Sequence, residues 1–96
     1  MKMINHQKQL WQNMIDLIES YINGTNNDFC DLVGKLEGAL DTSDIKNNEL
    51  INRWYDFLTP LEIRRAVEGN HIDNNKAIED LQKMKKFLLL EKKNFD

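Results

Sequence analysis

The sequence predicts an all-α fold: a compact, single-domain bundle of four to five antiparallel helices spanning residues 1–96. Apolar residues recur at helical spacing, and between Gln9 and Asn23 they fall within one arc of about 160° when turned 100° per residue. Nine isoleucines and twelve leucines accompany only two valines and three threonines, and no long stretch alternates apolar and polar residues. A β-sheet is therefore not expected. Short predicted loops favour antiparallel neighbours.

Two helices are expected in the first half of the chain. The first should cover about residues 4–23 and end at Gly24, because glycine readily adopts the left-handed conformation that terminates helices. Thr25 and Asp28 resemble a capping box with aspartate in place of glutamate. A second helix should follow at about 27–41. Its apolar stripe consists of Phe29, Leu32, Val33, Leu36 and Leu40.

Three further helices are expected after the turn residues 41–44. The first of them, at 48–58, has an apolar arc wide enough to contact two neighbours. The segment Thr59-Pro60-Leu61-Glu62 then combines a capping threonine, a proline at the first helical position and a glutamate three residues after the cap. This pattern predicts a break and a new helix at 60–69. Asp73 or Asn74 should cap a last helix at 74–90, with a polar tail fraying from Glu91.

Two features of these helices leave alternatives open. Gly34 and Gly38 each cost about 1 kcal/mol relative to alanine in a helix interior. They could let another helix approach closely, either within the domain or from a partner, or they could result from neutral drift. Phe87 and Leu90 fall outside the apolar stripe of the last helix. Either the helix ends early or the tail folds back over them, or they mark a contact site or a dimer seam.

The chain offers few residues for catalysis or metal binding. His6, Cys30 and His71 lack the spacing of metal-ligand pairs, so neither a metal nor another cofactor is expected. Neither histidine can be placed beside Ser20 or Ser43, which a nucleophilic mechanism would require. We therefore predict a protein that is not an enzyme. A small enzyme would need a pocket that joins His6 or His71 to acidic groups.

Cysteine content and hydropathy indicate the compartment. Cys30 is the single cysteine, so no intrachain disulfide can form, which fits the reducing cytoplasm. The longest apolar run, residues 87–90, is far too short to span a bilayer, and the N-terminus lacks the apolar segment of a secretory signal. A cytoplasmic bacterial protein with no membrane partner is expected.

Charge is distributed unevenly along the chain, whose formal net charge is -3. Residues 25–58 carry seven acidic and three basic side chains, whereas residues 76–96 carry six lysines and four acidic side chains. An acidic segment of this kind can steer a basic protein partner, although it can also be a merely solvated surface. The candidate partner-binding residues are Asp28, Asp31, Glu37, Asp41, Asp44, Glu49, Trp54, Tyr55 and Asp56.

A DNA-binding regulator using residues 59–90 is the alternative hypothesis. Two helices flanking Gly69 could be mistaken for a helix-turn-helix, and the second carries several lysines. However, Glu79 and Asp80 lie near the start of that helix, where a recognition helix would contact base edges. The basic footprint is thin, which argues against nucleic acid as a partner.

The segment Leu32-Val33-Gly34-Lys35-Leu36-Glu37-Gly38-Ala39-Leu40-Asp41, followed by Trp54-Tyr55, resembles small bacterial helical proteins found beside polymorphic or contact-dependent toxins. Some of those proteins act as immunity proteins. The resemblance covers about residues 32–69 and is mostly a helix pattern, so no residue-level site is carried over. It implies a non-enzymatic protein that binds a toxin domain and blocks it. A homodimer and a helical domain of unassigned role are also left open.

Overall fold

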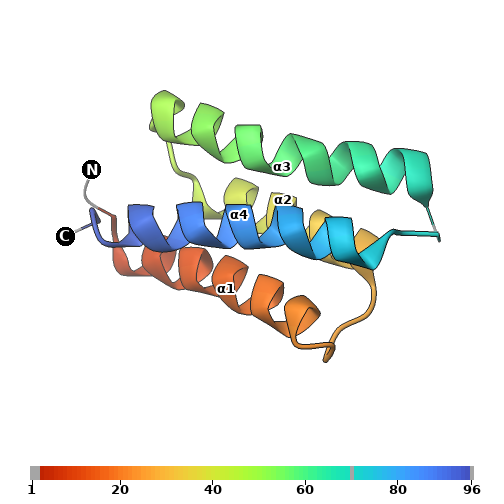
Figure 1. The fold of residues 1–96 in the computed structure, drawn as a ribbon. Coiled ribbons are helices and arrows are strands. Elements are labelled where there is room, and N and C mark those ends of the chain that lie inside the picture. Colours follow the sequence, from red (N-terminus) through yellow and green to blue (C-terminus); the bar gives the residue numbers. More distant parts are fainter. Residues whose placement is uncertain (1–2, 70, 96) are drawn as a thin grey trace.

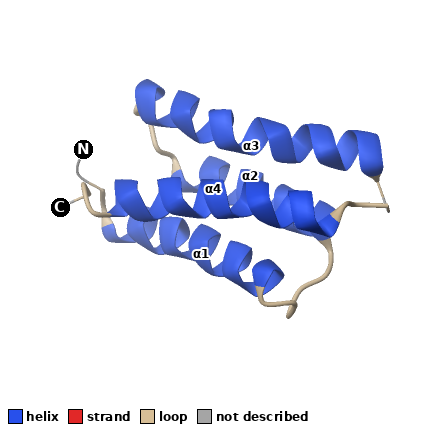
Figure 2. Cartoon of the chain, viewed as in Figure 1, coloured by secondary structure: helices blue, strands red, loops and turns tan. Residues whose placement is uncertain are grey.

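The computed structural model describes residues 3–69 and 71–95, and 79% of these residues are helical. There are four helices and no strand in this part of the chain (Figures 1 and 2). The bounds are α1 Asn5–Ile22, α2 Phe29–Ser43, α3 Asn48–Glu68 and α4 Asn74–Lys92. The predicted all-α bundle is therefore confirmed. None of these helices is both long and apolar enough to cross a membrane.

The four helices run alternately up and down, so that each is antiparallel to its neighbours along the chain (Figure 1). α1 packs against α2 and α4, and α3 packs against the same two helices. The backbones of α1 and α3 do not approach each other closely, nor do those of α2 and α4, which places each of these two pairs at diagonal corners of the bundle. Both ends of the chain lie at one end of the bundle (Figure 1).

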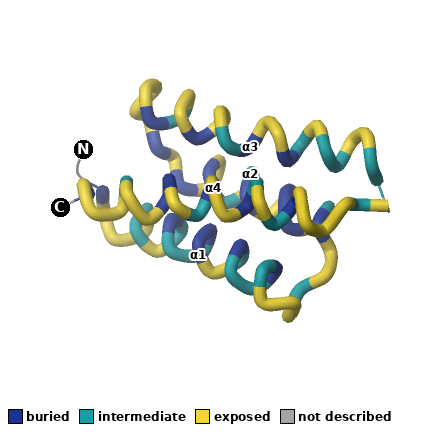
Figure 3. Tube along the Cα trace, viewed as in Figure 1, coloured by how far each residue is buried: buried dark blue, intermediate teal, exposed yellow. Residues whose placement is uncertain are grey.

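One hydrophobic cluster fills the space between the helices, and buried positions face inward on each of them (Figure 3). Its largest members include Trp11 and Trp54, which expose 1% and 0% of their surfaces. Trp11 donates its indole N–H to the backbone oxygen of Leu88 at 2.9 Å, so it joins the first helix to the last. The apolar stripes predicted from helical periodicity are the stripes that form this core.

The local stop and start signals are mostly confirmed. Gly24 has a φ of +81° directly after α1, as expected for a helix-terminating glycine. Asp73 caps α4 by accepting hydrogen bonds from the backbone N–H groups of Asn75 and Lys76. For α2, Asp28 alone is the cap, so the helix starts at Phe29 and not near 27. It also continues past 41 to Ser43 and ends at Asp44, whose φ is +54°.

The predicted break before Pro60 is wrong. Residues 48–58 and 60–69 are not two helices, because α3 is continuous from Asn48 to Glu68 with Pro60 inside it. Proline cannot donate the helical hydrogen bond to the carbonyl of Asp56. Both residues are exposed, so water can reach that region. The buried residues of α3, Leu50, Trp54, Leu58 and Leu61, lie on one stripe that crosses the proline in register, and their burial outweighs the local break signal.

The C-terminal segment is also more ordered than expected. α4 extends to Lys92 instead of ending at 90, and Phe95 is buried with its ring 5.0 Å from that of Trp11. Phe87 belongs to the core, because it stacks on Phe57 at 4.8 Å between ring centroids. The expected fraying from Glu91 was therefore wrong, and the helix does not end before Leu90. Of the alternatives left open for Phe87, a contact site is excluded, because Phe87 is buried. Leu90 remains 52% exposed.

Candidate functional site: an acidic surface on two helices

Acidic and small residues gather on the solvent side of α2 and on the adjoining side of α3. On α2 they follow each other at the three- and four-residue spacing that places side chains on one helix face. On α3 they lie three or seven residues apart, which again selects one face. We call this surface the acidic α2/α3 face. It consists of Gly34, Glu37, Gly38, Asp41, Tyr55, Glu62 and Arg65.

The centre of this face is a pair of carboxyl groups that belong to different helices. A hydrogen bond between the side chains of Glu37 and Glu62 is the main cause that raises the pKa of Glu37. Partial burial and the negative charge of Glu62 raise the pKa further, while the positive charge of Arg65 lowers it. Two carboxylates this close repel each other when both are ionised. The arrangement therefore favours a proton or a cation at this place.

Tyr55 stands beside the carboxyl pair and keeps 39% of its surface exposed. Burial of its hydroxyl is the largest cause that raises its pKa, followed by the negative charges of Asp41, Glu37 and Glu62. The negative charges of three carboxylates therefore contribute to raising the pKa of one partly exposed phenol. A tyrosine in such surroundings stays neutral and can donate a hydrogen bond at physiological pH.

The two glycines of α2, Gly34 and Gly38, leave a strip of helix backbone uncovered on this face. We call this strip the open lane. A Cβ added to Gly38 would meet no atom within 4 Å, and one added to Gly34 would meet only the guanidinium of Arg65, at 4.0 Å. Close packing against another helix of the domain was one of the alternatives left open by the sequence. It is excluded, because no neighbouring helix lies close to either glycine. They leave the backbone of α2 uncovered on the side of the acidic residues.

Three of the nine sequence-predicted partner-binding residues meet on this face: Glu37, Asp41 and Tyr55. Trp54 does not, because it is fully buried in the core, and its placement on a partner-binding surface is corrected. α3 turns by about 100° per residue, so adjacent aromatic residues face different sides. The burial of Trp54 follows from its place on the stripe of Leu50, Leu58 and Leu61.

The remaining predicted residues are exposed but scattered. Asp28 caps α2, and Asp31 pairs with Lys35 at 2.9 Å, near the end of the bundle away from the termini. Asp44 lies in the α2–α3 loop. Glu49 and Asp56 are two helical turns apart on the solvent side of α3. These five residues do not join the acidic face.

Glu62 and Arg65 belong to the face but were not among the predicted residues. Glu62 was interpreted as the third residue of a new helix, where it would complete a capping box with Thr59. The signal that could have found it is the spacing across Pro60. If 48–68 is read as one helix, then Tyr55, Glu62 and Arg65 share a side.

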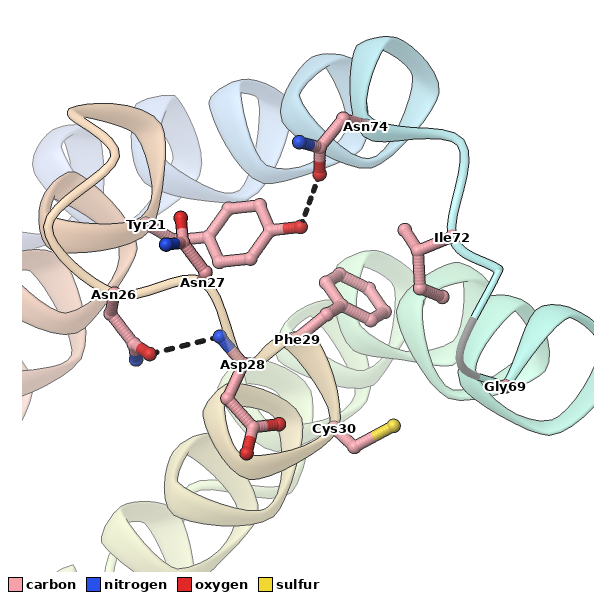
Figure 4. A pocket seen from close by; sticks show the side chains of 9 residues that line it. All are labelled: Tyr21, Asn26, Asn27, Asp28, Phe29, Cys30, Gly69, Ile72 and Asn74. Atoms are coloured by element: carbon pink, nitrogen blue, oxygen red, sulfur yellow. Dashed lines mark hydrogen bonds between the residues drawn. The ribbon is translucent and has the colours of Figure 1, made fainter.

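A second feature is an open depression of about 680 Å³ at the end of the bundle away from the termini (Figure 4). Its wall includes Tyr21, which donates a hydrogen bond to Asn74, and Asp28, whose carboxylate caps α2. Cys30 lies at its edge, and neither histidine is among the lining residues. The groups that line the depression therefore do not combine a nucleophile with a base.

The remaining candidates are clusters of metal-ligating side chains and the arginine of the segment considered for DNA binding. Within residues 3–69 and 71–95, no three histidine, cysteine or acidic side chains come close enough to hold a metal ion together. Arg64, in the segment considered for DNA binding, is clamped between Glu68 at 2.7 Å and Asp80 at 2.9 Å. Hydrogen bonds to these carboxylates raise its pKa. A guanidinium held in this way is already neutralised by its neighbours.

Comparisons with family models, with curated proteins and with solved structures found no match to this chain.

Proposed function

We propose that this chain is a non-enzymatic protein-binding module of the immunity or antitoxin kind, which binds and blocks a basic protein partner through the acidic α2/α3 face. The observation that carries the proposal is the pairing of Glu37 with Glu62 beside Asp41 and an exposed tyrosine. The resemblance of residues 32–69 to proteins encoded beside bacterial toxins points to a toxin domain as the partner.

The electrostatics of the face support a cationic partner. The repulsion between Glu37 and Glu62 lowers the stability of the free protein, and a lysine or arginine inserted between the two carboxylates would relieve it. The interaction gained on binding would then exceed that of an isolated surface ion pair, whose median contribution is about 0 to 1 kcal/mol. The surrounding negative potential would also accelerate the encounter with a basic protein.

Shape and side-chain type support a protein surface as the partner. Tyrosine is among the residues that most often dominate binding energy at interfaces, and Tyr55 offers ring surface and a hydroxyl together. The uncovered backbone at Gly34 and Gly38 gives a partner room to approach α2 closely. An anionic face of this kind repels the phosphates of nucleic acid.

The experiment is a binding titration with the product of a gene adjacent to the one that encodes this chain. We expect the double variant Glu37→Lys/Asp41→Lys to bind at least about a hundredfold more weakly, because close charge pairs at interfaces couple by about 1.5 to 7 kcal/mol. The association rate of the unaltered chain should fall steeply as salt is added.

The matched control is Glu49→Lys/Asp56→Lys, which makes the same change in net charge on the solvent side of α3, outside the face. It should keep most of the affinity. Equal losses in both variants would show that net charge alone matters and would reject the face. Salt-dependent binding to duplex DNA by the unaltered chain, without any protein partner, would favour the DNA-binding alternative instead.

A further inference from the structure

α4 carries two exposed leucines on its solvent side, opposite its buried stripe. Leu89 and Leu90 keep 40% and 52% of their surfaces exposed, whereas Leu81 and Leu88 are fully buried. The exposed pair lies in a shallow surface depression of about 310 Å³. We call it the Leu89–Leu90 patch. It is lined by Gln82, Lys85, Lys86, Leu89, Leu90 and Lys93.

Positive charge surrounds this apolar pair. Residues 82–93 contain five lysines and one glutamate, and that glutamate, Glu91, is already paired with Arg53. Lys85 pairs with Glu19 at 3.2 Å. Lys86 and Lys93 take part in no ion pair with the described residues. The patch therefore presents aliphatic surface with unpaired ammonium groups beside it.

Two of the three carboxylates of the acidic α2/α3 face, Glu37 and Asp41, lie on α2, diagonally across the bundle from α4. The third, Glu62, lies on α3, which packs against α4, but within the described residues no ion pair joins it to a lysine of the patch. The uneven charge distribution of the sequence thus becomes a separation in space. A negative surface lies on α2 and α3, and a basic, partly apolar surface lies on α4. An anionic body would be attracted to α4 and would leave the acidic face turned away from it.

The geometry favours a lipid surface over a protein as this body. Five of the six lining residues belong to α4 and the sixth, Lys93, is its C-cap, so the patch has no second wall that could hold an inserted helix or side chain. A second copy pairing through the same patch would bring Lys86 and Lys93 close to the same lysines, and like charges oppose such a pair. At a bilayer surface, exposed leucines enter the acyl boundary while lysine stems extend their ammonium groups to the phosphates.

We propose that the Leu89–Leu90 patch binds the surface of a membrane that contains anionic lipids. None of the described helices could span a membrane, but this does not bear on the proposed contact, because a surface contact needs only a small apolar area and nearby cations. In this orientation the acidic α2/α3 face would point into solution. The two surfaces would then act independently of each other.

The test is flotation of the unaltered chain with phosphatidylcholine vesicles, prepared with and without phosphatidylglycerol. We expect binding only to the vesicles with phosphatidylglycerol, and release of the protein as salt is added. Lys86→Glu/Lys93→Glu should reduce the partition coefficient at least about tenfold, since each lysine near an anionic surface contributes about 1 kcal/mol. The control Lys35→Glu/Lys46→Glu changes net charge equally on the other side of the bundle and should bind nearly as well as the unaltered chain.

A second variant separates apolar insertion from charge. Leu89→Ala/Leu90→Ala keeps every lysine and both helix-forming positions, and it should also weaken binding about tenfold. Circular dichroism must show each variant folded. The proposal fails if the unaltered chain does not bind phosphatidylglycerol vesicles at low salt, or if the two charge variants lose binding equally. Binding of polyglutamate in place of these vesicles would assign the patch to an acidic protein and overturn it as well.

Discussion

The two tryptophans lie at two different helix contacts of the bundle, and their indole N–H groups differ in hydrogen bonding. Trp11, between α1 and α4, has its indole N–H bonded to Leu88 and its ring in contact with Phe87 and Phe95. Trp54, on α3, is buried just as deeply, but its indole N–H has no hydrogen-bond partner among the described residues. A buried donor without an acceptor costs stability, so the second contact is the weaker of the two.

Other unfavourable features lie on α2 and α3 as well. Pro60 interrupts the hydrogen bonding of α3, Gly34 and Gly38 lower the helix propensity of α2, and Glu37 faces Glu62 across the contact. Natural proteins break several local rules at once mostly where function requires it. The comparison teaches that the α1–α4 contact satisfies its buried polar group, whereas α2 and α3 retain features that stability alone would remove.

The largest expected effect comes from removing the helix-interior proline. Pro60→Ala restores a backbone donor in α3 and should stabilise the protein by about 2 kcal/mol. This value is the free-energy cost of proline in a helix interior minus the stabilisation that proline gives by restricting the unfolded chain. Chemical denaturation measures the change. Thr59→Ala, at the adjacent exposed position, is the control and should shift stability by less than about 0.5 kcal/mol. A destabilised Pro60→Ala variant would mean that the proline supports α3.

The comparison of the two tryptophans can be tested directly with one substitution made twice. Trp11→Phe and Trp54→Phe lose the same volume, but only the first loses a hydrogen bond and only the second removes an unpaired buried donor. We expect Trp11→Phe to be less stable than Trp54→Phe by about 1 to 2 kcal/mol in urea unfolding. If the two variants are equally stable, then the two contacts do not differ in the way described.

Filling the open lane on α2 should give a smaller gain. Gly38→Ala meets no neighbouring atom and should stabilise the chain by about 1 kcal/mol through helix propensity. Gly24→Ala is the contrasting control, because its φ of +81° is strained for alanine, and it should destabilise the chain by about 1 kcal/mol. Thermal unfolding reports both signs. A Gly38→Ala variant that is no more stable would show that the lane is not open.

The smallest effect concerns the pH dependence of stability. The pKa of Glu37 is raised in the folded state, so the folded chain binds its proton more tightly than the unfolded chain does. Stability should therefore decrease as pH rises from the ordinary glutamate pKa through the raised one, and stay lower above it. Glu37→Gln should remove this component of the pH profile. A pH profile that is the same in Glu37→Gln as in the unaltered chain would contradict the assignment.

The candidate site was only partly predictable. Glu37 and Asp41 were selected because they belong to the acidic segment 25–58, and Tyr55 was singled out as an aromatic residue near acidic ones. Trp54 was misplaced because a single helix wheel shows which residues are apolar but not how many neighbours will cover them. Glu62 was missed because it lies 25 positions from Glu37 in the sequence, and local patterns relate only residues a few positions apart.

The amino-acid sequence by itself determined the helical class, the apolar stripes that became the core, the helix-terminating Gly24 and the start of α4 near Asp73, since these depend on interactions between residues a few positions apart. Only the tertiary structure decided that α3 runs through Pro60, that Phe87 is buried, and that Glu37 and Asp41 lie diagonally across the bundle from the lysines of α4. Those outcomes depend on burial against other helices. The free energy of such burial can exceed any local preference of the chain.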